Sequence, residues 1–244
     1  MPELVFGRHA VFHLLSAGRR RALKLYLQKG SEKTDLEIVK LAEAKKIPRH
    51  LQDAAFFNAK FGVQGHHQGI AVEAEAYPYA DFEDLLSENF ILILDEIQDP
   101  HNLGALCRSA CLFGVGGVII PETHAASVGP GACHSSVGAV EYLKIARVSS
   151  IAKAMEQLKE RNVWIYGADH GAEKVVFQES YPQKVALVIG SEERGLRRLV
   201  KERCDILVRI PNVSGAVDSL NASVAGGVIL YEIFRQKTLN SHQT

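Results

Sequence analysis

The sequence lacks several features that would assign it to a membrane or a secretory route. Its longest uninterrupted apolar runs, such as Phe90–Leu94, are far shorter than the roughly 18 residues that a membrane-spanning helix needs. The amino terminus, Met-Pro-Glu-Leu-Val, has no basic stretch followed by an apolar one, so no signal peptide is indicated. We therefore expect a cytoplasmic protein that makes no membrane contact.

Cysteine is also scarce, and its spacing is unsuited to a metal. Of the four cysteines, Cys107 and Cys111 lie four residues apart in a predicted helix. A zinc site would need a second, similarly spaced Cys/His pair. The only candidate is the adjacent pair Cys133-His134. We expect reduced thiols and no metal site.

The formal net charge of zero gives no support to nucleic-acid binding, but the charges are unevenly distributed. Residues 1–75 hold 12 Lys/Arg against 8 Asp/Glu, a net +4, and the remainder is correspondingly acidic. The densest basic cluster is Arg19-Arg20-Arg21 with Lys24, and Arg8 could join it. An RNA-facing amino-terminal module is therefore permitted, although charged clusters are often only solvated surface.

Residues 1–72 are predicted to form a small α/β domain. Helical periodicity covers Ala10–Leu15 and Asp35–Lys46, and strand patterns cover Leu23–Leu27 and His67–Val72. Residues 73–88 are acidic, contain Pro78 and have no clear period, which is typical of a linker.

From residue 89 to the end, short aliphatic runs alternate with helical segments. Such runs suit strands that are buried on both faces of a parallel sheet, so residues 89–244 are predicted to be a doubly wound α/β domain. The predicted strands are Ile91–Asp95, Val118–Ile120, Val163–Tyr166, Val185–Gly190 and Ile206–Ile210. The predicted helices are Leu103–Phe113, Ile151–Arg161, Arg197–Arg203 and Ser219–Gln236.

Three segments follow strands at the carboxyl edge of this sheet, where ligands bind in such folds. The first is Asn102-Leu-Gly-Ala-Leu-Cys-Arg108-Ser-Ala. We expect Asn102 to be the N-cap of a helix and Arg108 to lie on its second turn. Taken alone, the segment is better explained as a capped helix with one solvated arginine.

The second segment is Gly190-Ser-Glu192-Glu-Arg-Gly195-Leu. Its glycines bracket a tight turn in which backbone amides could face a ligand. It matches neither the dinucleotide-binding glycine fingerprint nor a phosphate-binding loop. An ordinary strand-to-helix turn is an equally good explanation of the segment taken alone.

The third segment runs from Ile210-Pro to Ser219-Leu220-Asn221-Ala-Ser-Val-Ala. Asp218, Ser219 and Asn221 crowd the start of a helix that is apolar around much of its circumference, and some of these polar residues are expected to be caps. Gly226-Gly227 would permit another helix to approach closely. A helix of this kind is buried against more than the sheet, so a dimer interface is a reasonable hypothesis.

Together, and in this order, the three segments resemble motifs 1, 2 and 3 of the SpoU (TrmH) family of RNA 2′-O-ribose methyltransferases. Phe6-Gly-Arg8-His-Ala-Val and His67-Gln-Gly-Ile resemble the ends of the L30e-like RNA-binding domain of longer members, some of which methylate a guanosine of 23S ribosomal RNA. The resemblance thus covers nearly the whole chain. The stretch from Ile210 to Ser219 departs from it, being about one residue longer and carrying Asp218.

The resemblance implies a SPOUT-type methyltransferase domain with a carboxyl-terminal trefoil knot, joined to a small L30e-like domain. It implies S-adenosylmethionine as cofactor, held mainly by backbone groups around Gly190, Ile210 and Leu220, with Gly167 on the adenine side. It also implies a homodimer through the knotted domain, with 23S ribosomal RNA as partner. The RNA contacts would include Arg8, Arg19, Arg20, Arg21 and Lys24.

The resemblance further implies which residues do chemistry. Arg108, contributed to the active site around the partner's cofactor, would act on the ribose hydroxyl, but arginine is almost never deprotonated in proteins. We expect it instead to bind a flanking phosphate and stabilise developing negative charge. Asn102 would position the reacting region, while Glu192, Ser219 and Asn221 would order the surrounding loops.

Three alternatives remain open at this stage. The substrate could be a tRNA ribose, although the shorter tRNA-specific members lack the amino-terminal domain. The chain could be a catalytically silent RNA-binding paralogue, although a silent relative would be expected to have lost some of the motif residues. A small-molecule α/β enzyme would show no dependence on RNA.

Overall fold

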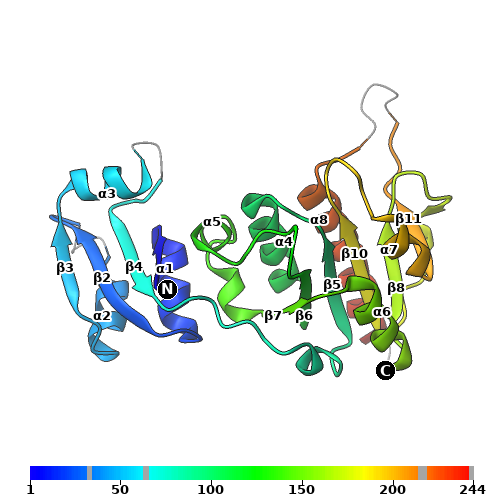
Figure 1. Cartoon of the computed structure of the whole chain (residues 1–244), viewed down its shortest axis with the longest axis horizontal. Coiled ribbons are helices and arrows are strands. Elements are labelled where there is room, and N and C mark those ends of the chain that lie inside the picture. Colours follow the sequence, from blue (N-terminus) through cyan, green and yellow to red (C-terminus); the bar gives the residue numbers. More distant parts are fainter. Residues whose placement is uncertain (32–34, 63–65, 214–218, 242–244) are drawn as a thin grey trace. The chain divides into compact units, whose positions relative to one another are not determined.

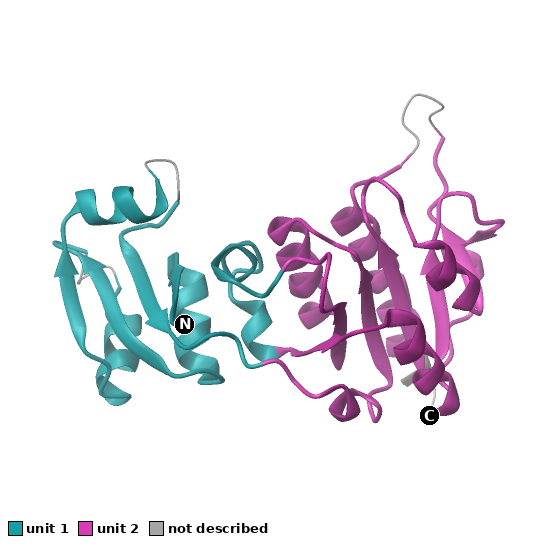
Figure 2. Cartoon of the chain, viewed as in Figure 1, with its two compact units in different colours: residues 1–78, 127–142 teal, residues 79–126, 143–244 magenta. Residues whose placement is uncertain are grey.

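The computed structural model describes residues 1–31, 35–62, 66–213 and 219–241, and it divides into two compact units (Figure 2). Unit 1 comprises Met1–Pro78 and Ser127–Tyr142, and unit 2 comprises Tyr79–Ala126 and Leu143–Thr244. Ser127–Tyr142 therefore packs with the amino-terminal residues, although it lies inside the predicted domain 89–244. None of the described helices is long and apolar enough to cross a membrane.

Unit 1 is a four-stranded sheet with helices, in the strand order β1-β4-β2-β3 (Figure 1). Strands β2 and β3 are parallel, and the other pairs are antiparallel. The strands are β1 (Glu3–Phe6), β2 (Ala22–Gln28), β3 (Arg49–Gln52) and β4 (Ile70–Ala74). The helices are α1 (Arg8–Ala17), α2 (Leu36–Ala44), α3 (Ala54–Phe61) and α5 (Pro130–Ser135), with a 3₁₀ turn η2 (Ala139–Tyr142).

Four predicted elements are present among residues 1–78 of unit 1, and three elements of that stretch were missed. The predicted helices correspond to α1 and α2, and the predicted strands to β2 and β4, which begins three residues later than expected. Strands β1 and β3 and helix α3 were not predicted. Strand β3 is polar and largely exposed at the sheet edge, so it has no alternation of apolar residues by which it could be found.

A buried ionic cluster joins Ser127–Tyr142 to the rest of unit 1. The Arg20 guanidinium lies 2.5 Å from the Glu141 carboxylate and 2.8 Å from Glu3. Its Nη2 also donates to the Cys133 Sγ at 2.9 Å. Arg20 is only 4% exposed, so this member of the predicted RNA-binding cluster belongs to the interior.

Unit 2 is built on a seven-stranded sheet in the order β7-β6-β5-β10-β8-β11-β9, in which every described pair is parallel. The strands are β5 (Phe90–Asp95), β6 (Gly117–Pro121), β7 (Lys144–Val148), β8 (Trp164–Ala168), β9 (Lys174–Val175), β10 (Val185–Gly190) and β11 (Ile206–Arg209). The helices are α4 (Pro100–Leu112), α6 (Ile151–Glu160), α7 (Arg198–Arg203) and α8 (Ala222–Ser241), with 3₁₀ turns η1 (Phe82–Leu85) and η3 (Val176–Gln178). The predicted parallel α/β fold is confirmed.

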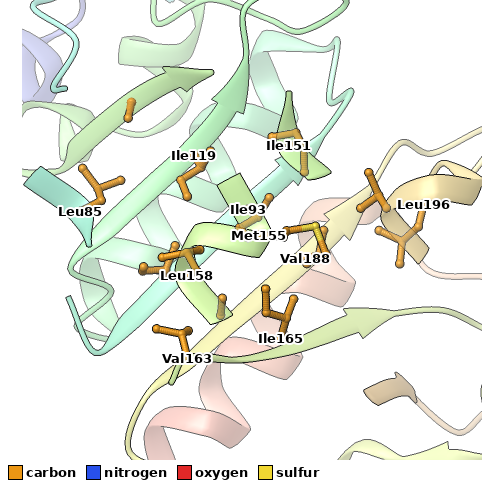
Figure 3. Packing of buried hydrophobic residues seen from close by; sticks show 14 residues of the cluster. Leu85, Ile93, Ile119, Ile151, Met155, Leu158, Val163, Ile165, Val188 and Leu196 are labelled. Atoms are coloured by element: carbon orange, nitrogen blue, oxygen red, sulfur yellow. The ribbon is translucent and has the colours of Figure 1, made fainter. Parts of the chain in front are cut away.

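Helices cover both faces of this sheet. On one face, Met155 of α6 packs with Ile93 and Val188 in a buried apolar cluster (Figure 3). Val200 of α7 belongs to the same cluster. On the other, α8 packs against α4 and β10. A Cβ added at Gly226 would lie 2.3 Å from Leu106 Cδ2. The expected close approach of two helices at this glycine is therefore present.

The thiols of the folded chain are expected to react slowly. Burial raises the pKa of both Cys133 and Cys204 to about 12, and the Arg20 guanidinium offsets only part of that rise at Cys133. Cys107 is fully buried. At pH 8 a thiol with such a pKa is a thiolate about one time in 10⁴, and the thiolate is the reactive form.

A thiol-reactive chromogenic disulfide, added at pH 8 with and without denaturant, measures this reactivity. We expect all four thiols to react rapidly once the chain is unfolded and at most one, the half-buried Cys111, to react within minutes when it is folded. Rapid reaction of two or more thiols in the native protein would contradict the burial described here.

Candidate active site

The first motif forms the loop after β5 and the start of α4. Asp99, not Asn102, is the N-cap of this helix: its side chain accepts from the His101 backbone N–H at 2.9 Å. The prediction for Asn102 was wrong because Asp99 caps equally well and Pro100 favours the first helical position. Asn102 is instead inside the first turn of α4.

Asn102 nevertheless points at the second motif. Its Nδ2 donates a hydrogen bond to the Glu192 carboxylate, 90 residues further along the chain. The helix after β5 and the loop after β10 are thus linked through two residues that the sequence had singled out separately. Strands β5 and β10 are neighbours in register, with Asp95 opposite Gly190, which is why the two segments meet.

The second motif is a tight loop closed by its own backbone. Ser191 and Gly195 exchange backbone hydrogen bonds of 3.2 and 2.9 Å. A Cβ at Gly190 would lie 2.2 Å from the Gly195 carbonyl carbon, so only glycine fits there, and Gly195 has a left-handed φ of 64°. The loop is therefore held in one conformation with backbone groups at the end of the strand.

A buried carboxylate fastens this loop to β5. Asp95, fully buried at the end of β5, accepts from the Arg197 backbone N–H at 2.9 Å and from its Nε at 2.7 Å. Arg197 also pairs with Glu96 at 3.1 Å. The backbone of Glu96 has a left-handed φ of 61°. Sequence reasoning missed this pair, although a carboxylate that ends an otherwise apolar strand was a usable signal.

The third motif supplies the cap of α8. The Asn221 Oδ1 accepts from the backbone N–H of Ser223 at 2.9 Å and of Val224 at 3.4 Å, as expected for one of the polar residues there. Ser219 and Leu220 are exposed just before this cap. Asp218, which marked the departure from the family pattern, lies in 214–218, outside the described residues.

Three of the expected cofactor-binding positions, Gly167, Gly190 and Ile210, lie at or near the carboxyl ends of strands. Strand β8 lies between β10 and β11, with Gly167 opposite Val188 on one side and Leu207 on the other. A Cβ at Gly167 would lie 2.7–2.9 Å from three neighbouring side-chain atoms, so this glycine is tightly packed. Ile210 follows β11 and is half-buried. Glycines thus lie at or next to the carboxyl ends of two neighbouring parallel strands, β8 and β10.

Arg108 is separated from this edge in its own chain. It lies six residues after Asn102 on α4, which places the two side chains about 120° apart around the helix. It is exposed, and among the described residues it has no hydrogen-bond or ion-pair partner. The single chain therefore brings Asn102 and Glu192 together but leaves Arg108 on another face.

Two family models match the chain. The SpoU rRNA Methylase family matches residues 89–231, and the model described as RNA 2′-O ribose methyltransferase substrate binding matches residues 4–80. The chain belongs to the SpoU rRNA methylase family. The resemblance stated from the three motifs is thereby confirmed. The amino-terminal residues of this SpoU chain match a separate family model, as their resemblance to an RNA-binding domain predicted.

Named relatives match along nearly the full length of this SpoU chain. It is 37% identical to the 23S rRNA (guanosine-2′-O-)-methyltransferase RlmB of Escherichia coli over 98% of this chain and 100% of that one. It is also 37% identical to the putative TrmH family tRNA/rRNA methyltransferase YacO of Bacillus subtilis, over 96% of each.

Solved structures show the same fold. AviRb of Streptomyces viridochromogenes, a SpoU methyltransferase solved in complex with the cofactor AdoMet, has a TM-score of 0.82 and 26% identity over 97% of this chain and 90% of that one. The TrmH/SpoU tRNA modifying enzyme of A. aeolicus has a TM-score of 0.57 and 26% identity, but the match covers only 66% of this chain and 82% of that one.

The Asp95–Arg197 pair of this SpoU chain leads to a stability prediction. Arg197→Ala would leave Asp95 buried without its cation, which typically costs about 3–5 kcal/mol. Asp95→Asn keeps an acceptor for the Arg197 backbone and removes the buried charge, so we expect a smaller loss, about 1–3 kcal/mol. Urea unfolding of both variants measures the difference.

Arg198→Ala is the matched control, because the neighbouring arginine is 92% exposed and its one ion pair among the described residues is with Glu202 in the next turn. We expect it to change the free energy of unfolding by less than about 0.5 kcal/mol. Equal stability of the Arg197→Ala and Arg198→Ala variants would show that the Asp95–Arg197 pair does not hold the loop.

Proposed function

We propose that this protein transfers a methyl group from S-adenosylmethionine to the ribose 2′-hydroxyl of a guanosine in 23S ribosomal RNA. The observation that carries the proposal is the 37% identity to E. coli RlmB across both units. The substrate-binding model over residues 4–80 supports it. The tRNA-modifying structural relative covers only 66% of the chain, which favours ribosomal RNA over tRNA.

The strand ends of unit 2 fit S-adenosylmethionine. Gly190 and Gly167 bring backbone close to one edge of the sheet, while the half-buried Ile210 and the half-exposed Leu220 offer apolar surface to an adenine. When bound, the cofactor supplies a methyl group on a positively charged sulfonium. Recognition through backbone groups agrees with the absence of a dinucleotide fingerprint from the sequence.

The ribose hydroxyl is a weak nucleophile at neutral pH, so its proton must leave during the transfer. We assign Arg108 to the RNA: its guanidinium donates to the flanking phosphate and to the oxygen as negative charge develops there. Asn102 positions the reacting nucleotide and is itself held by Glu192. Asn221 orders the start of α8, and Ser219 faces the RNA beside it.

Arg108 reaches such a site most simply from a second copy of the chain. It lies one helical turn before Leu112, which is 68% exposed, so the two share a face of α4. Beside them, α8 exposes Val224, Val228 and Tyr231 at helical spacing. The Phe113 ring packs against Tyr231 at 5.7 Å, which joins the two helices into one apolar surface.

We propose that this surface, the α4–α8 face, forms a homodimer. An isologous contact would bury the apolar side chains of both copies and carry the Arg108 of each toward the cofactor site of the other. We also propose that the chain between β10 and α8 is tied in the trefoil knot of the SPOUT fold, and that the enzyme works in the cytoplasm.

Transfer of labelled methyl groups tests the proposed function. Transcribed, unmodified 23S ribosomal RNA and transcribed tRNA are incubated separately with the protein and labelled S-adenosylmethionine, and the modified ribose is mapped. We expect one 2′-O-methylguanosine in the 23S RNA. Label in tRNA alone would overturn the substrate, and binding of the cofactor and RNA without transfer would indicate a silent paralogue.

A further inference from the structure

A cavity of about 480 Å³ lies in unit 1 where α1 ends, β2 begins and α2 leads into β3. Its floor is closed by Leu14, Leu15 and Ile47, which are buried. Its accessible apolar residues are the half-buried Ala22 and Leu23 and the exposed Pro48. Its volume is in the range of about 300–1,000 Å³ that is common for sites of small ligands. The cavity lies within unit 1 and does not involve the motifs of the active site.

Three exposed cations, Arg21, Lys45 and Lys46, line the same cavity. Among the described residues, none of the three has an acidic partner within ion-pair distance. Their charges are therefore available to an anion. A cavity lined by both apolar side chains and three cations matches a ligand that is apolar at one end and anionic at the other.

The structure separates Arg21 from its neighbours in the basic cluster of the sequence. Arg20 is buried with Glu141, and Arg19 donates to the Tyr77 hydroxyl at 3.1 Å. Lys24 pairs with Glu73 at 3.4 Å. Arg8, assigned with them, pairs with the buried Asp35 at 2.7 Å. Arg21 is thus the exposed residue of this cluster that has no acidic partner among the described residues, and it lies together with lysines that are distant in sequence.

The backbone at Lys46 supports a role beyond solubility. This residue follows the end of α2 with a left-handed φ of 55°, a position where glycine or asparagine is the usual, less strained choice. A lysine there can compensate the helix dipole, but Lys45 already supplies a cation at that end. Keeping a second lysine in a strained position places another charge at the cavity.

We propose that this cavity binds one unpaired nucleotide of the substrate RNA. The base enters against Ala22, Leu23 and Pro48, and the phosphates on either side lie on Arg21, Lys45 and Lys46. Unstacked bases are the usual targets of proteins that bind RNA specifically, and apolar surfaces or guanidinium planes can receive them. The site rests on the proposed function, because it assigns to unit 1 a defined contact with the same RNA.

A triple variant of the full chain, Arg21→Gln/Lys45→Gln/Lys46→Gln, tests the phosphate contacts. The matched control, Lys29→Gln/Lys40→Gln/Lys60→Gln, removes the same charge from exposed positions of unit 1 that do not line the cavity. The measurement is the Kd for transcribed 23S ribosomal RNA at several salt concentrations. The cavity variant should bind at least ten-fold more weakly than wild type. The magnitude of its slope of log K against log salt concentration should be smaller by about 2–3.

A variant that fills the cavity without changing charge, Leu23→Trp, tests the entry of the base. It should weaken RNA binding at least five-fold while leaving the salt dependence unchanged. Binding equal to the control in the triple variant, or wild-type binding by Leu23→Trp, would overturn the proposal. Cofactor affinity should stay within two-fold of wild type in all three variants.

The outcomes separate this site from the proposed function. If wild-type protein binds the RNA but transfers no methyl group, the proposed function fails, and the binding series still decides whether the cavity is the contact. If wild-type protein methylates the RNA and the cavity variants bind like the control, the proposed function stands and the nucleotide site is wrong.

Discussion

Replacing Arg108 by alanine should reduce methyl transfer by about 10²–10³-fold, the typical cost of removing one donor to developing negative charge. The side chain is exposed and unpartnered among the described residues, so the fold should not change. Cofactor affinity should stay within a few-fold. Single-turnover transfer to the 23S RNA, with cofactor binding measured by calorimetry, gives both values.

The control is Arg161→Ala, which removes an exposed arginine at the end of α6. This helix leads into the amino end of β8, the opposite edge of the sheet from the motifs. We expect near-wild-type transfer from the control. Near-wild-type transfer from Arg108→Ala itself would remove Arg108 from the assigned role.

Mixing two inactive variants tests whether Arg108 acts on the partner's site. Arg108→Ala and Glu192→Ala each damage a different contribution to the same composite site. If subunits exchange at random, half of the dimers are mixed and each has one intact site, so about one quarter of wild-type activity should return. If Arg108 acted within its own chain, each subunit of a mixed dimer would keep its defect and no activity would return.

Tyr231→Asp should convert the protein to a monomer and reduce transfer by at least about 100-fold, because it places a charge at the centre of the α4–α8 face. Tyr231 is 52% exposed, so the single chain should still fold. Sedimentation at micromolar concentration measures the association state, and the transfer assay measures activity.

Trp164→Asp is the matched control: Trp164 is similarly exposed but lies at the start of β8. It should remain dimeric. A Tyr231→Asp variant that is dimeric and fully active would contradict the proposed interface. A variant that is monomeric and fully active would show that one chain holds a complete site.

The parallel domain was predictable because each of its central strands is a continuous aliphatic run. Val185–Gly190 was predicted with the bounds that the structure gives. Edge strands gave weaker signals: β7 has exposed residues at Lys144 and Arg147, and β9 has two residues. Neither carries the apolar run of a strand that is covered on both faces, and neither was predicted.

The site was predictable as a set of residues but not as a set of contacts. The motifs named Asn102 and Glu192. Their hydrogen bond, however, depends on β10 lying beside β5 in the sheet, although the two strands are far apart in the sequence. The basic cluster failed for a related reason. Adjacent residues along an extended chain point in different directions, so the Arg20 side chain is buried beside Glu141 and the Arg21 side chain is exposed.

The membership of Ser127–Tyr142 in unit 1 also bears on how such enzymes can be recombined. The chain passes between the units three times, after residues 78, 126 and 142. A cassette that ended at the first passage would carry Arg20 but leave behind Glu141, its buried counter-ion. Grafting this RNA-recognition unit onto a shorter methyltransferase would therefore require the transfer of two separate segments. The unit could not be gained or lost in evolution as one terminal segment independent of the catalytic half.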